Sequence, residues 1–263
     1  MIESGRDSEA LQIDLDAVSR WASAWQLSWH IKKCGALYVG TGPSPQYFMN
    51  GFPLPIVSSI RDLGITYSNS LSFESHIAGL VKKAKYTTRS IFLAFPGHDR
   101  DFYLFLFKTY VRPLLEFSTP VWSPALKHLV TLVESVQKKF TKRLFSSCAH
   151  SISYPQRLRV LRLESLEERR IRFDLLALFR TVNSEYVHSS SEFFKFSGST
   201  RRNADLLSVY RRTSKCSNFW SFRVVHYWNH LPLQIRNLHT LTAFKNALSS
   251  HKLADPCIGY AYA

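Results

Sequence analysis

The sequence predicts an α+β fold that is mostly helical, with one small antiparallel sheet followed by a series of helices. Two observations indicate this class. Short strand-like segments divided by turn residues occur only between residues 36 and 67, whereas apolar residues recur at three- and four-residue steps from residue 72 onward. With 263 residues and 45% hydrophobic side chains, the chain is long and apolar enough to bury a core in one or two domains.

An amphipathic helix is predicted first, over residues 11–29. Its apolar stripe, which we expect to pack against the rest of the protein, comprises Leu11, Leu15, Val18, Trp21 or Ala22, Trp25 and Trp29. Strand-like segments follow at residues 36–39, 46–49 and 64–67, separated by turn signals that include Asn50-Gly51. These segments predict the small antiparallel sheet.

Four longer helices are predicted after the sheet. The spacing of their apolar residues places them over residues 72–95, 99–113, 125–145 and 165–183. Pro96-Gly97 ends the first, and Asp99 or Asp101 starts the second. Ser165 and Glu168 have the spacing of a capping box at the start of the fourth, which Asn183 ends.

The remainder of the chain has a weaker pattern. Residues 184–218 are rich in serine and basic residues, which predicts a long loop or linker and a domain boundary. Two shorter helices are expected within residues 219–252, over 219–231 and 241–252. Residues 253–263 are expected to form a tail.

The formal net charge of +15 is unevenly distributed along the chain. It amounts to −1 over residues 1–60, +7 over residues 61–150 and +9 over residues 151–263. Such an excess attracts polyanions over a distance of about 8 to 10 Å at physiological salt, so nucleic-acid phosphates are the expected partner. An anionic membrane surface is the competing partner.

Much of this charge recurs at helical spacing in three clusters opposite or beside the apolar stripes. The clusters are Lys82, Lys83, Lys85 and Arg89; Lys138, Lys139, Lys142 and Arg143; and Arg169, Arg170 and Arg172. Ridges of this kind suit phosphate contacts, although a merely solvated charged surface is the alternative for any one of them. Glu134 lies four residues before Lys138, so we expect these two side chains to pair.

Several classes of protein and site are disfavoured. The longest uncharged apolar run, Phe102 to Phe107, is far too short to cross a bilayer, and the first residues lack the pattern of a signal peptide. The four cysteines are widely separated, which fits reduced thiols in the cytosol or nucleus rather than a disulfide framework.

No complete set of metal ligands or catalytic residues emerges. His226 and His230 have a spacing that can bind zinc, and Cys216 precedes them, but packed or hydrogen-bonded histidines are the favoured interpretation. Asp14 and Asp16 diverge on a helix and cannot chelate one metal ion together. No metal ligand is therefore predicted.

A series of short motifs runs through most of the chain in a fixed order. They are Asp14-Leu-Asp16, Trp25-Gln-Leu27, Lys33-Cys34, Asp62-Leu-Gly64, His76-Ile77, Lys83-Ala84, Val111-Arg-Pro113, Leu115-Glu116, Val121-Trp122-Ser-Pro124, Glu134-Ser-Val-Gln137, Phe140-Thr-Lys142-Arg143, Arg157-Leu158, Ser165-Leu166-Glu167, Trp228-Asn-His-Leu-Pro232 and Phe244-Lys245. The succession resembles the reverse transcriptase of jockey-like LINE elements, which are non-LTR retrotransposons, downstream of its catalytic hairpin. The resemblance covers about residues 10–252, and its specificity comes from the order and number of the motifs.

The resemblance implies a domain organisation. Residues 1–70 would be the end of the polymerase palm, 72–147 a helical thumb, and 148–183 the start of the family's carboxy-terminal segment, continued after the 184–218 linker. Lys33 matches the family's late palm lysine, and the basic helix around Lys82 to Arg89 would follow the template and primer backbone.

The resemblance also bears on activity. The aspartate pair of the family belongs upstream of residue 10, so we expect this chain alone to be no enzyme. Mg²⁺ is expected only for a complete polymerase, and no cofactor is expected for this segment. The expected partners are RNA, DNA or an RNA–DNA hybrid. The alternative is a basic helical module that binds a protein or a membrane without a catalytic role.

Overall fold

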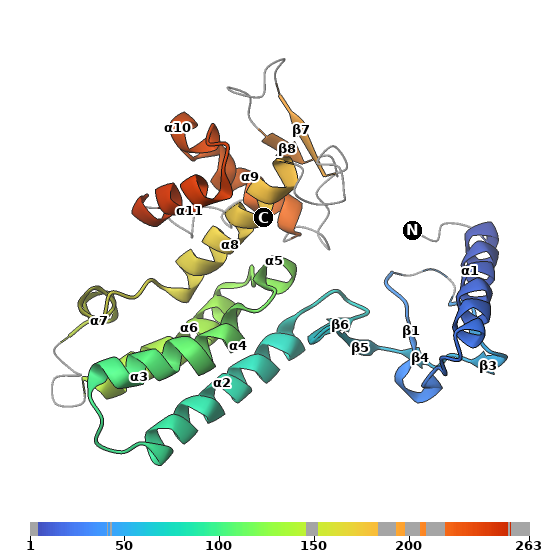
Figure 1. Ribbon diagram of the computed structural model, residues 1–263, viewed down its shortest axis with the longest axis horizontal. Coiled ribbons are helices and arrows are strands. Elements are labelled where there is room, and N and C mark those ends of the chain that lie inside the picture. The colour runs from blue at the N-terminus through green and yellow to red at the C-terminus, as the bar shows by residue number, and fades with distance from the viewer. Residues whose placement is uncertain are drawn as a thin grey trace. The chain divides into compact units, whose positions relative to one another are not determined.

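The computed structural model describes residues 5–40, 42, 44–145, 152–183, 193–197, 206–208, 219–251 and 253 (Figure 1). Helices form most of this part of the chain, and its strands pair into two-stranded sheets. The predicted class, α+β and mostly helical, is confirmed at this level. The chain divides into two compact units, residues 1–76 and residues 77–263.

The described residues of the first unit form one long helix and six short strands. Its elements are α1 (Gly5–Ala24), a 3-10 turn η1 (Ile31–Lys33), β1 (Ala36–Leu37), β2 (Phe48–Met49), β3 (Phe52–Pro53), β4 (Ile56–Val57), β5 (Ser59–Asp62) and β6 (Ile65–Ser68). The expected single antiparallel sheet is wrong in detail, because the strands form three separate pairs and β1 pairs with β4 in parallel. The strands β3, β4 and β5 were missed by the sequence pattern.

Two of these pairs are tight hairpins. Asn50-Gly51 joins β2 to β3, as predicted, and Leu63-Gly64 joins β5 to β6. All four turn residues have positive φ, between 45° and 88°. Two successive residues of this kind give the twist that a two-residue hairpin needs, which Asn and Gly adopt at little cost. Leu63, by contrast, is strained there and 86% exposed.

The helix α1 packs by a narrower face than its sequence suggests. Leu11 and Leu15 pack against a small core of Tyr47, Met49 and Leu54. The side-chain amide of Gln12 fixes the contact, because it donates to the carbonyl of Phe48 and accepts from its N–H. The expectation that the whole apolar stripe packs is wrong for Val18 and for Trp25, which follows the last residue of α1; they are 44% and 68% exposed. Of the two alternatives Trp21 and Ala22, Ala22 is the buried one, at 1% exposed, and Trp21 is 56% exposed.

Helices dominate the second unit. Its elements are α2 (Glu74–Ala94), α3 (Arg100–Leu106), a π-helical segment η2 (Phe107–Val111), α4 (Arg112–Glu116), α5 (Thr119–Trp122), α6 (Lys127–Leu144), α7 (Tyr154–Val160), α8 (Leu166–Val182), β7 (Phe194–Phe196), β8 (Leu206–Ser208), α9 (Trp220–Asn229), α10 (Leu233–Arg236) and α11 (Leu241–Ser250). The boundary between the two units lies in the first turn of α2. The short helices α5, α7 and α10 were not predicted. No described helix has the length and apolar character needed to span a membrane.

The second predicted helix starts where expected and ends later. Asp99 caps α3, its carboxylate accepting from the N–H of Phe102 at 2.8 Å. The helix widens into η2 and continues as α4 beyond Pro113, which was expected to end or kink it. Proline is tolerated there because it lies in the first turn of α4, where a backbone donor is not needed.

One core of the second unit lies between α2, α3 and α6, which run side by side in Figure 1. The Phe140 ring of α6 stacks on Phe107, with ring centroids 4.2 Å apart. Phe92 of α2 packs against the same Phe140 ring, at a centroid distance of 5.8 Å. These contacts bury the apolar face of α2 and turn its opposite face to solvent.

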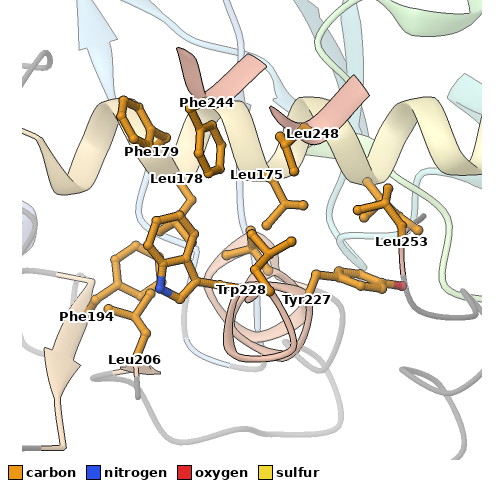
Figure 2. Close-up of a cluster of buried hydrophobic side chains, with 13 residues drawn as sticks. Leu175, Leu178, Phe179, Phe194, Leu206, Tyr227, Trp228, Phe244, Leu248 and Leu253 are labelled. Atoms are coloured by element: carbon orange, nitrogen blue, oxygen red, sulfur yellow. The ribbon is translucent and has the colours of Figure 1, made fainter. Parts of the chain in front are cut away.

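A second core joins α8, α9 and α11 with the β7–β8 pair (Figure 2). Phe179 of α8 stacks on Phe244 of α11 at 4.4 Å, and Trp228 of α9 packs on the same ring. Phe194 and Leu206, from the two strands, are also buried here. The predicted loop over 184–218 is therefore wrong for β7 and β8, and the rest of that segment lies outside the described residues.

The tail prediction also falls largely outside the described part of the chain. Leu253 is described and belongs to the second core, with only 9% of its surface exposed. The expected tail is therefore wrong for Leu253, which is packed against the second core.

A buried ion pair ties the second core to α5. Arg223 of α9 donates to Asp174 of α8 from Nε at 2.8 Å and also to the carbonyl of Pro120 at 2.6 Å. The Arg223 and Asp174 side chains are only 5% and 2% exposed. Burial raises the pKa of the Asp174 carboxyl, and the adjacent Arg223 guanidinium opposes that rise.

Candidate nucleic-acid interface

The solvent face of α2 carries a stripe of cationic and apolar side chains. At about 100° per residue, Lys82, Tyr86, Arg89 and Leu93 lie within about 60° of one another around the helix. Tyr86 is 73% exposed and Leu93 is 66% exposed. Gly79 continues the stripe, and the space where its Cβ would stand is open. The stripe is directed outward because Ile77, Val81, Ala84, Ile91 and Phe92 bury the other face.

The four predicted cations of α2 are available to a partner. Lys82, Lys83 and Arg89 are exposed, and Lys85 is half-buried. Within the described ranges, no carboxylate forms an ion pair with any of them. The positive charge of this face is therefore not neutralised by the protein itself.

A second set of exposed cations lies at the carboxy-terminal end of α6. Lys138, Lys139, Lys142 and Arg143 are all exposed. The partial negative charge of a helix carboxy terminus stabilises cations in its last turn, where Lys142 and Arg143 lie. Two of these side chains also lie over rings, with Lys138 Nζ 5.3 Å from the Tyr154 centroid and Arg143 Cζ 4.1 Å from that of Phe92.

The predicted pairing of Glu134 with Lys138 is wrong. Glu134 is only 7% exposed, and its carboxylate accepts from the Tyr154 hydroxyl and from the N–H of Leu166. Burial and the neighbouring carboxylate raise the pKa of Tyr154 far above its usual value, so the phenol stays protonated and donates. Glu134 thus joins α6 to α7 and α8, and Lys138 keeps its charge unpaired.

The third predicted cluster, on α8, is not a free cationic ridge. Arg169 forms a two-point ion pair with Glu116 and contacts Glu164, while Arg172 pairs with Glu164 at 2.9 Å. Arg170 is 2% exposed. Burial alone disfavours the charge of Arg169, but the hydrogen bonds and charge of Glu116 raise its pKa overall.

The sequence expectation for Arg169, Arg170 and Arg172 as an unmatched ridge is therefore corrected. Glu116 was missed because it is 53 residues from Arg169, a separation that helical spacing cannot detect, whereas Glu164 is only five residues before Arg169 and was overlooked because it precedes the helix. Arg172 also donates to the carbonyl of Leu248 in α11. These arginines hold α8 against α4 and α11, which is a structural role.

Lys33 is an exposed residue at the end of η1 in the first unit. No ion pair with a described carboxylate involves it. The structure assigns it no chemistry, so its correspondence to the family's palm lysine stays a prediction.

The two histidines of α9 contact each other. Their rings lie 4.3 Å apart, and His230 Nδ1 is 2.7 Å from the carbonyl oxygen of His226. Burial, and then the proximity of His230, lower the pKa of His226. Cys216 lies outside the described residues. In the part of the chain that the structure describes, no three His, Cys, Asp or Glu side chains gather as a metal-binding group.

The comparisons with known proteins leave the family open. No protein-family model matches the chain, and no solved structure matches it. An uncharacterized protein of Caenorhabditis elegans is 28% identical over 132 residues, which are 50% of this chain and 67% of that protein. The name of that relative assigns it no activity.

Proposed function

We propose that this chain binds the phosphate backbone of RNA, DNA or an RNA–DNA hybrid through α2 and α6. The observation that carries the proposal is that some basic residues form ion pairs inside the protein and others do not. Arg169, Arg172 and Arg223 are used internally in ion pairs, whereas the cations of α2 and α6 are unpaired within the described residues. Unpaired cations at successive turns suit phosphates, because each contact releases condensed counterions.

The shape of the α2 stripe supports a nucleic-acid partner more than a generic anionic surface. Tyr86 lies between Lys82 and Arg89, so a ring is available for stacking or sugar contact beside two phosphate-binding side chains. Gly79 leaves the helix surface low at one end, which lets a strand approach the helix backbone. Contacts of this kind follow the backbone and carry little sequence preference.

We further propose that the chain is the thumb-like, carboxy-terminal part of a non-LTR retrotransposon reverse transcriptase. This proposal rests on the ordered motif series. Without the aspartates that bind two metal ions, such a segment positions a duplex and catalyses nothing by itself. Mg²⁺ would then belong to the complete polymerase, and the proposed partners place the chain in the cytosol or nucleus.

The binding test uses the full chain and a fluorescently labelled RNA–DNA hybrid. We expect Lys82→Gln/Lys83→Gln/Arg89→Gln to weaken binding and to reduce the slope of log affinity against log salt by about 3, since each cation contributes about one unit. The measurement is fluorescence anisotropy over a series of salt concentrations.

A matched control removes the same charge elsewhere. Arg159, Arg162 and Lys245 are exposed and lie outside both ridges, so their triple glutamine variant should keep most of the slope. Equal losses in the two triple variants would show that only net charge matters. Absence of hybrid binding by the unmodified chain at low salt would overturn the proposal.

A second candidate function has its own observation. The exposed side chains of Val18 and Trp21 on α1, and of Trp25 directly after it, form an apolar surface, which favours association with a protein or an anionic membrane. Flotation with anionic liposomes, combined with no hybrid binding, would favour this alternative. Retention of hybrid binding by a Trp21→Ser/Trp25→Ser variant would separate the two surfaces.

A further inference from the structure

A pocket lies where the end of α2, the start of α3 and the end of α6 meet. Its volume is about 380 Å³, and its lining includes Phe92, His98, Arg100, Tyr103, Arg143 and Leu144. Volumes of about 300 to 1,000 Å³ are typical of small-molecule sites. No acidic side chain lines it.

Two arginines at this pocket are positioned by aromatic rings. The Arg143 guanidinium lies 4.1 Å from the centroid of Phe92, and that of Arg100 lies 4.5 Å from the centroid of Phe145. Arg100 Nε also donates to the carbonyl of Leu144 at 3.3 Å. Contacts of this kind orient a guanidinium without neutralising it, so less freedom is lost when an anion binds.

Neither arginine is paired with an acid of the described chain. Asp99 and Asp101 flank Arg100 in the sequence. The Asp99 carboxylate caps α3 through the N–H of Phe102, and Asp101 forms no ion pair with either arginine. Arg169 shows the contrast, because Glu116 and Glu164 occupy its guanidinium. The pocket therefore combines two oriented positive charges with no internal counter-charge.

A histidine completes the polar lining. The His98 ring stacks on the Phe102 ring with their centroids 4.2 Å apart and an interplanar angle of 24°. This contact fixes the orientation of the imidazole. The Tyr103 hydroxyl is already used, since it donates to the carbonyl of Phe95. The ring face of Tyr103, rather than its hydroxyl group, is thus what this residue offers to a ligand.

We propose that this pocket binds a phosphomonoester, the terminal phosphate of a nucleotide or of a strand end, through Arg100 and Arg143. A phosphomonoester carries close to two negative charges at neutral pH, and the guanidinium fork matches its oxygens. A phosphate alone would not fill about 380 Å³, so room remains for the ester group beside apolar ring surface. The proposal shares Arg143 with the α6 set of the proposed function, whereas Arg100 belongs to the pocket alone.

The test titrates the full chain with adenosine 5′-monophosphate and, separately, with adenosine, by isothermal calorimetry. We expect the nucleotide to bind and adenosine not to bind. Arg143→Gln and Arg100→Gln should each weaken nucleotide binding by about 10- to 100-fold, the effect of losing a charge-assisted hydrogen bond. Arg159→Gln, which removes an exposed charge outside the pocket, should leave it unchanged.

A conservative variant distinguishes two-point binding by the Arg143 guanidinium from simple attraction to its positive charge. Arg143→Lys keeps the charge and loses the two-point geometry, so it should bind more weakly than the unmodified chain and more tightly than Arg143→Gln. Equal binding of adenosine and its monophosphate would overturn the proposal. So would an Arg143→Gln variant that binds the nucleotide as well as Arg159→Gln does.

The source of the phosphate is settled with a pair of short single strands, one 5′-phosphorylated and one with a 5′-hydroxyl. Both are titrated into the Lys82→Gln/Lys83→Gln/Arg89→Gln variant, in which the α2 ridge is removed. Tighter binding of the phosphorylated strand assigns the pocket to strand ends, whereas nucleotide binding without that preference assigns it to free nucleotides. Because the ridge variant should keep nucleotide affinity, failure of the ridge proposal and failure of the pocket proposal give different results.

Discussion

Arg223 and Asp174 show how much one buried pair contributes at the level of single residues. The two side chains are 5% and 2% exposed, and Arg223 also satisfies carbonyls of α5. Removing the guanidinium leaves a buried carboxylate without its partner, which costs more than the pair itself contributes.

We expect Arg223→Ala to lower the free energy of unfolding by about 3 to 5 kcal/mol. Urea unfolding followed by circular dichroism measures this change. Arg159→Ala, on the surface of α7, should cost less than about 0.5 kcal/mol. The explanation fails if an Arg223→Ala/Asp174→Asn double variant is no more stable than Arg223→Ala.

His226 gives the stability of the protein a pH dependence with a defined sign. Its pKa is lowered in the folded chain, first by burial and then by His230. Protonation therefore favours the unfolded state, and the stability is complete above the ordinary histidine value of about 6.5 and falls as the pH drops below it. His76, whose pKa is lowered by burial and by Arg61, acts in the same direction in the first unit.

The urea midpoint should accordingly be lower at pH 5.5 than at pH 7.5. Because a glutamine at position 226 cannot be protonated, His226→Gln should show a smaller difference between the two midpoints. An unchanged difference in that variant would mean that other groups cause the dependence.

At the scale of elements, the amino terminus of α8 is fixed by a local motif. Ser165 Oγ accepts from the N–H of Glu168 at 3.1 Å, and Glu168 Oε2 accepts from the N–H of Ser165 at 3.1 Å. The capping box predicted from the sequence is confirmed. We expect Ser165→Ala to cost about 1 kcal/mol, measured by thermal unfolding, and Ser165→Asp to recover most of it. An alanine variant as stable as the parent would contradict this role.

The starts of α3 and α8 and the end of α8 were predictable because local residues determine them. Asp99 and Ser165 start α3 and α8, and Asn183 ends α8, through contacts within a few residues. The β7–β8 pair was not predictable, because its burial depends on distant partners. Asn229 of α9, for example, bonds both backbone groups of Leu206 from 23 residues away. Val18 and Trp25 were misjudged because helical spacing identifies an apolar stripe but neither the width of its contact nor the end of the helix, which is Ala24.

At the scale of the whole molecule, the structure separates two uses of positive charge. The candidate ridges on α2 and α6 were found from spacing alone, since i to i+4 recurrence identifies a common face. The same reasoning failed for Arg169 and Arg172, because the spacing of basic residues reveals neither Glu116, on α4, nor Glu164, which lies just before α8. The pocket at Arg100 and Arg143 was missed for a similar reason, since it requires three elements to meet.

The buried pair between α8 and α9 also limits how a gene for this protein can be shortened. A stop codon anywhere between Val182 and Arg223 would remove the arginine that forms the ion pair with Asp174. It would also remove α9 and α11, which pack with Leu175, Leu178 and Phe179 in the second core (Figure 2). Descendants that keep α8 are therefore expected to keep α9 as well, so the two helices should be inherited, or lost, together.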